Sequence, residues 1–231
     1  MAEPFSGAPR RRRGRGWRLV VAVLVVVLIA WAAWLVEFSQ MFGVRQIDVR
    51  GVSLVTEGDV VAAAGVAIGQ PMVRINGQSI SDAVTAALPE VKSVDVRRQW
   101  PGTLVLQITE RVAVYQLVAD GMYYLVSDDG VAFHQAAMDQ TLLVASVVTQ
   151  SQPLLADIAT VVTSLPPELA AHVRDVQAQS RESITLQLDD DRQVVWGSAE
   201  QSDLKAQVIM PLLTVPGTVY DVSAPASPAV R

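Results

Sequence analysis

Cysteine is absent from the 231-residue chain, and histidine occurs only twice, at His134 and His172. Without cysteine the chain can form no disulfide, no thiolate metal site and no cysteine nucleophile. Two histidines this far apart do not supply the i, i+4 pair of a helical zinc site. The nucleophile elbow G-x-S-x-G and the glycine patterns of Walker and Rossmann sites are also missing. We therefore expect no enzyme activity, no cofactor, no metal and no small-molecule substrate.

Lysine is scarce as well, with only Lys92 and Lys205 beside sixteen arginines. Six of those arginines fall in residues 1–18, which carry a single acid, Glu3. The rest of the chain holds 12 basic and 22 acidic side chains and is therefore acidic. A nucleic-acid-binding domain needs the opposite balance, so the arginines that precede Trp100 do not indicate a nucleic-acid platform. We expect no nucleic-acid partner.

One long apolar run stands out, LVVAVLVVVLIAWAAWLV at residues 19–36, which contains no charge. At a rise of about 1.5 Å per residue the run spans about 27 Å, close to the hydrocarbon thickness of a bilayer. It predicts a single transmembrane helix, preceded by a cytoplasmic basic tail at 1–18 and followed by a juxtamembrane linker at 37–43. The bulk of the chain then lies outside the plasma membrane. A cleaved secretory signal is the alternative, because Ala-Trp-Ala at 30–32 fits a small-x-small cleavage site.

Residues 44–111 show the pattern of a small α+β domain with the order β-α-α-β-β. The alternation in RQIDVRG predicts the first strand. TEGDVVAAAG predicts a short helix that is capped by Thr56 and ended by Gly65. SISDAVTAALPEV predicts a second helix, which starts near Ser79 or Ser81 and ends before the Leu-Pro pair.

The last two strands of this domain lie in VRRQWPGTLVLQITER, residues 96–111. Apolar and polar residues alternate on both sides of Trp100-Pro101-Gly102. Pro101 fixes φ and lacks an N–H, and glycine accepts turn conformations, so this tripeptide predicts the turn of an antiparallel hairpin. The hairpin completes a three-stranded sheet that two helices cover on one face.

Residues 112–231 predict a second, mixed α/β domain. YYLVSDDGVAFHQ predicts a hairpin that turns at Asp129-Gly130, and TLLVASVV predicts a further strand. QPLLADIATVVTSL and QSDLKAQVIMPLLT have helical spacing. SITLQLDDDRQVVWG predicts another hairpin, with its three aspartates as a solvated turn rather than a calcium loop. TVYDVSAPASPAV predicts a last strand and a tail whose prolines confine any pairing to a sheet edge.

These features together resemble the FtsQ/DivIB family of bacterial cell division proteins. The basic tail, the apolar helix and FGVRQIDVRG are similar to its N-terminal part, and LPEVKSVDVRRQWPGTLVLQITERVAVY is similar to the block that ends its POTRA domain. YYLVSDDGVAFHQ and YDVSAPASPAV resemble parts of the following β domain. The positions that carry the most specific part of the resemblance are Arg98, Trp100, Pro101, Thr103, Leu104, Glu110 and Arg111.

The resemblance implies a POTRA domain at 44–111, a mostly antiparallel β domain at 112–231, and a non-enzymatic divisome scaffold at the division septum. Such a scaffold links early and late division proteins and binds FtsB- and FtsL-like partners, with FtsW/FtsI-like septal synthesis proteins as further candidates. In the family the partner strand adds to the C-terminal edge of the β domain. The matching residues here are Val219, Tyr220, Asp221, Val222, Ala229 and Val230.

Two other functions are compatible with parts of the sequence. One is a POTRA-containing protein of envelope transport or assembly, although no barrel-like run of strands follows the POTRA pattern. The other is a membrane-anchored envelope hydrolase, against which the missing nucleophile motifs count.

Overall fold

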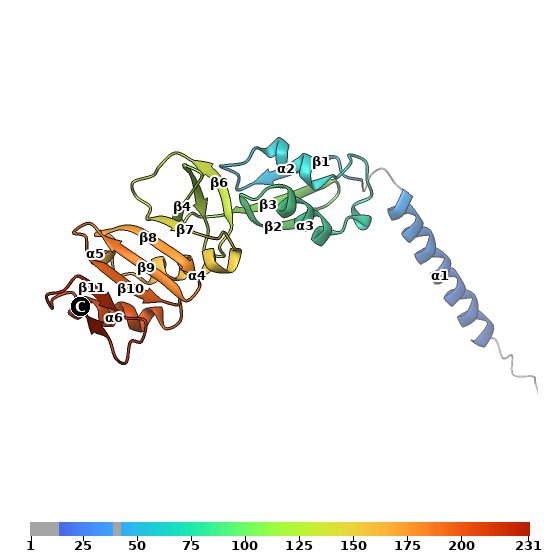
Figure 1. The fold of residues 1–231 in the computed structure, drawn as a ribbon. Helices are drawn as coiled ribbons and strands as arrows, with labels where there is room; N and C mark the ends of the chain where they lie inside the picture. The colour runs from blue at the N-terminus through green and yellow to red at the C-terminus, as the bar shows by residue number, and fades with distance from the viewer. Residues whose placement is uncertain (1–13, 39–42) are drawn as a thin grey trace, which may run out of the picture.

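The computed structural model describes residues 14–38 and 43–231, so most of the predicted tail and linker lie outside the described residues. The apolar run forms a helix, α1 (Gly14–Phe38), which lies apart from the two sheets in Figure 1. Among the residues whose side chains the structure describes, no helix is long and apolar enough to cross a membrane. The predicted span at 19–36 also includes residues 19 and 32–36, whose side chains lie outside that description.

The first domain contains a three-stranded sheet in the order β1-β3-β2. β2 (Val91–Gln99) and β3 (Thr103–Glu110) are antiparallel, which confirms the predicted hairpin and its turn. β1 (Gln46–Arg50) pairs parallel with β3, so the last strand of the hairpin lies in the middle of the sheet. The Trp100–Pro101 peptide bond in the turn is cis.

Two helices cover one face of this sheet, as predicted (Figure 1). α2 (Glu57–Ala64) begins after Thr56, whose side chain accepts a hydrogen bond from the Asp59 N–H at 3.2 Å. A 3₁₀ turn, η2 (Met72–Arg74), leads to α3 (Gly77–Ala87). The predicted start of this helix at Ser79 or Ser81 is wrong, because Asn76 caps it by accepting from the Gln78 N–H at 3.0 Å. Asparagine is as good an N-cap as serine, and here it begins the helix ahead of both serines.

The second domain contains a nine-stranded sheet in the order β12-β11-β10-β9-β8-β7-β4-β5-β6. Five of its eight neighbouring pairs are antiparallel, in agreement with the expected mostly antiparallel sheet. The strands are β4 (Tyr115–Ala119), β5 (Met122–Val126), β6 (Ala132–Ala136), β7 (Val144–Val147), β8 (Val173–Ser180), β9 (Ser183–Leu188), β10 (Gln193–Gly197), β11 (Val219–Asp221) and β12 (Ala229–Val230).

Three helices belong to this domain: α4 (Gln152–Ser164), α5 (Pro167–Ala170) and α6 (Ser202–Leu212). Apolar residues of α4 and α6, such as Ile158 and Ile209, are fully buried in one core with the inner face of the sheet. Trp196 of β10 is the largest fully buried side chain of that core. Its indole N–H is also satisfied, because it donates to the Ser202 hydroxyl at 3.1 Å.

The two domains are joined directly by Glu110 and Arg111. The Glu110 carboxylate accepts hydrogen bonds from three consecutive backbone N–H groups, at 2.8, 2.9 and 3.2 Å, in residues 53–55 of the first domain. Arg111 donates to the Pro89 carbonyl at 2.9 Å and to both carboxylate oxygens of Asp129 at 2.6 Å. Its side chain is only 13% exposed. Arg111 therefore connects a loop of the first domain to a turn of the second.

We expect Glu110→Gln to make the protein less stable by about 1 kcal/mol at neutral pH, because a neutral amide accepts hydrogen bonds more weakly than a carboxylate. Burial opposes ionisation of Glu110, but the three backbone N–H groups outweigh it, so its pKa lies below the usual value. The ionised group therefore stabilises the fold fully above the usual carboxyl pKa of about 4.3, and this contribution is lost as the pH falls through the lower folded pKa.

Urea unfolding of wild type and variant between pH 3 and pH 7 measures this difference. The two stability curves should converge at the acid end. If they stay parallel over the whole range, Glu110 is not the group that titrates.

Candidate partner-binding edge

The outermost strand at the C-terminal end of the nine-stranded sheet is β12. It pairs antiparallel with β11, with Val230 opposite Tyr220 and Ala229 opposite Asp221. The Arg231 N–H donates to the Val219 carbonyl at 2.9 Å, and the Val219 N–H donates to the Arg231 carbonyl at 3.0 Å. β12 is thus held by backbone hydrogen bonds along its inner side.

The backbone groups of β12 that point away from β11 belong to Val230. In an antiparallel pair, residues that exchange hydrogen bonds alternate with residues whose N–H and C=O point the other way. Arg231 exchanges both bonds with Val219, so its neighbour Val230 directs its N–H and C=O outward. Pro228, two residues earlier, has no N–H and so cannot donate a hydrogen bond at this edge. Among the described residues, this end of the sheet therefore presents a short edge centred on Val230.

β11 does not lie at the edge but one strand further inside. Tyr220 is 1% exposed and Val222 is fully buried, so both are core residues. The Tyr220 hydroxyl donates to the carbonyls of Val215 and Gly217, at 2.8 and 3.0 Å. The family-matched residues Val219 and Asp221 are half-buried, and Ala229 is exposed. The structure thus brings five of the six predicted residues together on two paired strands, with Val222 directly after β11, but gives them different environments.

Arg192 fixes the loop that precedes β11. Its guanidinium lies 5.7 Å from the centre of the Tyr220 ring, within the range of a cation–π contact. It also donates to the Leu213 carbonyl at 3.2 Å and pairs with Asp190 in the turn between β9 and β10. The three aspartates at 189–191 pair with His172, Arg192 and Arg174, respectively. The described residues contain no group of three or more ligands that could hold a metal ion.

Gly217 provides the space in which β12 packs. A Cβ atom at this position would lie 2.3 Å from the Cγ1 atom of Val230 and 3.1 Å from the Arg231 carbonyl oxygen. A side chain here would force the Val230 side chain and the Arg231 carbonyl to move, so glycine lets the outermost strand lie this close to the preceding loop. Neither Gly217 nor Arg192 was among the predicted site residues, because in the sequence they look like an ordinary turn glycine and an exposed basic residue.

The seven family-motif residues lie far along the chain from this edge, in and after the β2–β3 hairpin. Leu104 is buried, and the Arg98 guanidinium donates to the Ile75 carbonyl at 2.6 Å. Glu110 and Arg111 form the junction described above. These residues shape the first domain and its connection to the second, and they do not contribute to the edge at β12.

Comparison with known proteins identifies both domains. A model of the POTRA domain, FtsQ-type, matches residues 42–111, and a model of the Cell division protein FtsQ/DivIB, C-terminal, matches residues 113–217. The cell division protein FtsQ of Mycobacteroides abscessus is 34% identical over 231 residues, which cover 99% of this chain and 74% of that protein. The FtsQ of Streptomyces collinus is 32% identical and is matched over 97% of this chain and 92% of that protein.

Among solved structures, the major extracytoplasmic domain of the cell division protein DivIB from Geobacillus stearothermophilus aligns with 43% of this chain and 87% of that chain. The identity is 10% and the TM-score is 0.35, which is too low for this likeness to carry an argument.

Proposed function

Because this chain belongs to the FtsQ/DivIB family of bacterial cell division proteins, we propose that it is a membrane-anchored divisome scaffold whose partners bind by strand addition at β12. The scaffold is not an enzyme and is concentrated at the division septum, where it links early and late division proteins. Its partners are FtsB- and FtsL-like proteins, with FtsW/FtsI-like proteins as further candidates. Nothing in the two matched domains favours the envelope-transport or hydrolase alternatives.

The proposed anchor is the apolar run at 19–36, which lies within α1. Eighteen uncharged residues are enough to span the hydrocarbon core, and the arginines of the preceding tail favour a cytoplasmic N-terminus. The protein would then cross the plasma membrane once, with both sheet-containing domains outside. Single-cysteine accessibility to a membrane-impermeant maleimide in intact cells tests this topology, because the chain has no cysteine of its own.

The outermost position of β12 is the observation that supports the binding site. An extended partner segment can pair with the outward N–H and C=O of Val230 and continue the sheet by one strand. The short edge gives few main-chain bonds, so side chains of the partner must supply much of the affinity. The exposed Ala229 lies where such a strand would pass.

We expect a photo-crosslinker attached to Ala229→Cys in the full-length protein to capture the FtsB-like partner of the same bacterium. The matched control is Val148→Cys in the same domain, where the native side chain is 79% exposed. Mass spectrometry of the crosslinked peptides measures the outcome. Equal capture from the two positions would place the partner elsewhere and contradict the proposed site.

A disulfide between Asp221→Cys and Ala229→Cys tests how the strand binds. These residues form a hydrogen-bonded antiparallel pair, whose Cα atoms are typically about 5.5 Å apart, within disulfide range. Addition outside β12 predicts that the oxidised and reduced proteins bind the partner equally. Binding that is lost on oxidation and restored by reduction would mean that the partner strand replaces β12 against β11.

A further inference from the structure

Three separate segments of the first domain meet at one end of its sheet: residues 43–45, 66–75 and 97–102. The Val44 N–H donates to the Gln70 carbonyl at 2.9 Å, and the Gly69 N–H donates to the Val44 carbonyl at 2.7 Å. The Arg45 N–H donates to the Gly102 carbonyl at 2.7 Å. The hydrogen bond from Arg98 to Ile75 ties the third segment to the second. We call this surface the basic end of the first domain.

Large apolar side chains are exposed on the basic end. Ile68 is 66% exposed, Trp100 is 50% exposed and Val73 is 46% exposed. They come from the loop after α2, from the β2–β3 turn and from the short 3₁₀ helix η2. A single exposed apolar residue is ordinary, but these three belong to segments that hydrogen bonds tie together, and we call them the apolar tip.

Charge is segregated in the same place. The first domain, from Gly43 to Arg111, has seven basic and seven acidic residues and is neutral overall. Four of the basic residues, and none of the acids, belong to the three segments of the basic end. These four arginines are all exposed: Arg45, Arg74, Arg97 and Arg98. One of them, Arg97, also pairs at 2.6 Å with Asp95, which lies just outside the segment. The rest of the domain is correspondingly acidic.

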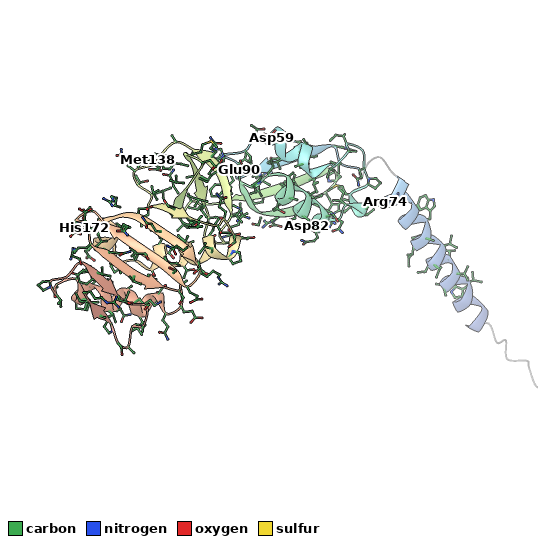
Figure 2. All side chains as sticks on the ribbon, in the orientation of Figure 1. Asp59, Arg74, Asp82, Glu90, Met138 and His172 are labelled. Atoms are coloured by element: carbon green, nitrogen blue, oxygen red, sulfur yellow. The ribbon has the colours of Figure 1, made fainter. Side chains whose placement is uncertain are left out.

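The chain also leads from the basic end toward α1. Only five peptide steps separate Phe38, the last residue of α1, from Gly43, and five steps span at most about 18 Å. Gly43 is itself part of the basic end, where it forms an isolated bridge with Pro71. Figure 2 shows Arg74 at the side of the domain that faces α1.

We propose that the basic end rests on the surface of the membrane that holds α1, with its apolar tip among the lipid headgroups and its arginines on anionic lipid phosphates. Tryptophan suits the interface between headgroups and acyl chains, and arginine pairs with phosphate through two parallel hydrogen bonds. Basic residues near an anionic bilayer are attracted to its surface. Because the segment between α1 and the first domain is short, it gives the basic end a high effective concentration at the membrane surface. The inference depends on the membrane anchoring proposed above.

The test uses full-length protein in nanodiscs, with one environment-sensitive fluorophore attached to a single introduced cysteine. Labels at Ile68→Cys and Val73→Cys should emit at shorter wavelength in discs rich in phosphatidylglycerol, and headgroup spin-labelled lipid should quench them. A label at Val148→Cys, in the second domain, should show neither effect. In discs of phosphatidylcholine alone the shift at Ile68 and Val73 should decrease, because that surface has no net negative charge. At 0.5 M salt it should also decrease, because salt screens the arginine contribution.

A charge reversal provides the matched comparison. Arg74→Glu should reduce the shift of the Val73 label, whereas Arg50→Glu, which removes an exposed arginine of β1 outside the basic end, should leave it unchanged. If the Ile68 and Val73 labels show no emission shift and no quenching in anionic discs, like the Val148 label, then the proposed contact between the basic end and the membrane is wrong. A label at Val27→Cys in α1 reports anchoring separately: no quenching there would contradict the anchor itself, whatever the other labels show.

Discussion

Gly130→Ala is expected to lower the free energy of unfolding by about 3–5 kcal/mol, because the new Cβ atom has no space. Gly130 has φ +75, and a Cβ there would lie 2.4 Å from both the Ala156 nitrogen and the Gln152 carbonyl oxygen. Both contacts are backbone atoms in the first turns of α4, which cannot move without shifting the helix. The hairpin turn and the helix must therefore separate, and the core between them opens.

The chain offers a close control for this prediction. Gly121, in the β4–β5 turn, has the same φ of +75, but a Cβ there would meet nothing within 4 Å. Gly121→Ala should cost only the strain of a left-handed residue, about 1–2 kcal/mol. Urea or thermal unfolding of the two variants separates backbone strain from collision. Equal losses would show that α4 does not pack as closely on the turn as the structure indicates.

Lys205→Met is expected to destabilise the protein by about 3 kcal/mol, although methionine nearly fills the same volume. Lys205 lies on α6 and is only 1% exposed. Its ammonium donates to the carbonyls of Trp196 and Ser198, at 3.0 and 2.8 Å, where β10 ends. Methionine has no donor, so both carbonyl oxygens would lose these hydrogen bonds in a buried site.

The effect should depend on pH in a defined direction. Burial disfavours the charged ammonium and lowers the pKa of Lys205 below its usual value. Between the folded and the usual pKa the unfolded chain binds more protons, so the stability of the wild type rises with pH across that alkaline window. Lys205→Met lacks this rise.

Leu204→Met, at the neighbouring residue of α6 that is 45% exposed, serves as the control and should change stability by less than about 0.5 kcal/mol. A Lys205→Met variant as stable as the control would mean that water replaces the lysine at the two carbonyls.

The elements that the sequence predicted well are those with one clear periodicity. The β2–β3 hairpin alternates strictly on both sides of Trp100-Pro101-Gly102, and the helix at 57–64 has both a cap and a glycine stop. Two strands were not predicted, β4 and β8. In β4 the first three residues, Tyr115, Gln116 and Leu117, are all buried, so the polar Gln116 does not mark an exposed face. In β8 the register shifts between Val173 and Asp175, which breaks the two-residue period.

Gln116 shows why such a strand escapes prediction. Its side-chain amide donates to the Ala137 carbonyl at 3.0 Å and accepts from the Asp139 N–H at 2.8 Å. A polar residue in this position looks solvent-facing in the sequence, yet its partners come from a loop more than twenty residues later. Strand order is equally non-local: the parallel pairing of β10 with β11 depends on the intervening helix α6, not on any local pattern.

The sequence predicted that the C-terminal tail pairs at a sheet edge, but it did not predict that the residues of β11 are buried. The prolines of the tail correctly confined its pairing to a sheet edge, where β12 lies. The alternation in Val219, Tyr220 and Asp221 did not reveal that a further strand covers β11. Substituting charged residues at Tyr220 or Val222 would therefore disrupt the core before it reported on any partner.

The junction at Glu110 and Arg111 has a consequence for distance. β3 ends at Glu110 and β4 begins at Tyr115, so only four residues connect the sheets, and the first of them is bonded to both domains. We expect such a short, bonded connection to hold the two domains in a fixed position relative to each other. If the basic end rests on the bilayer and partners add a strand at β12, as proposed above, then the protein itself fixes the height of the β12 edge above the membrane. It would then select partners whose strands reach that height.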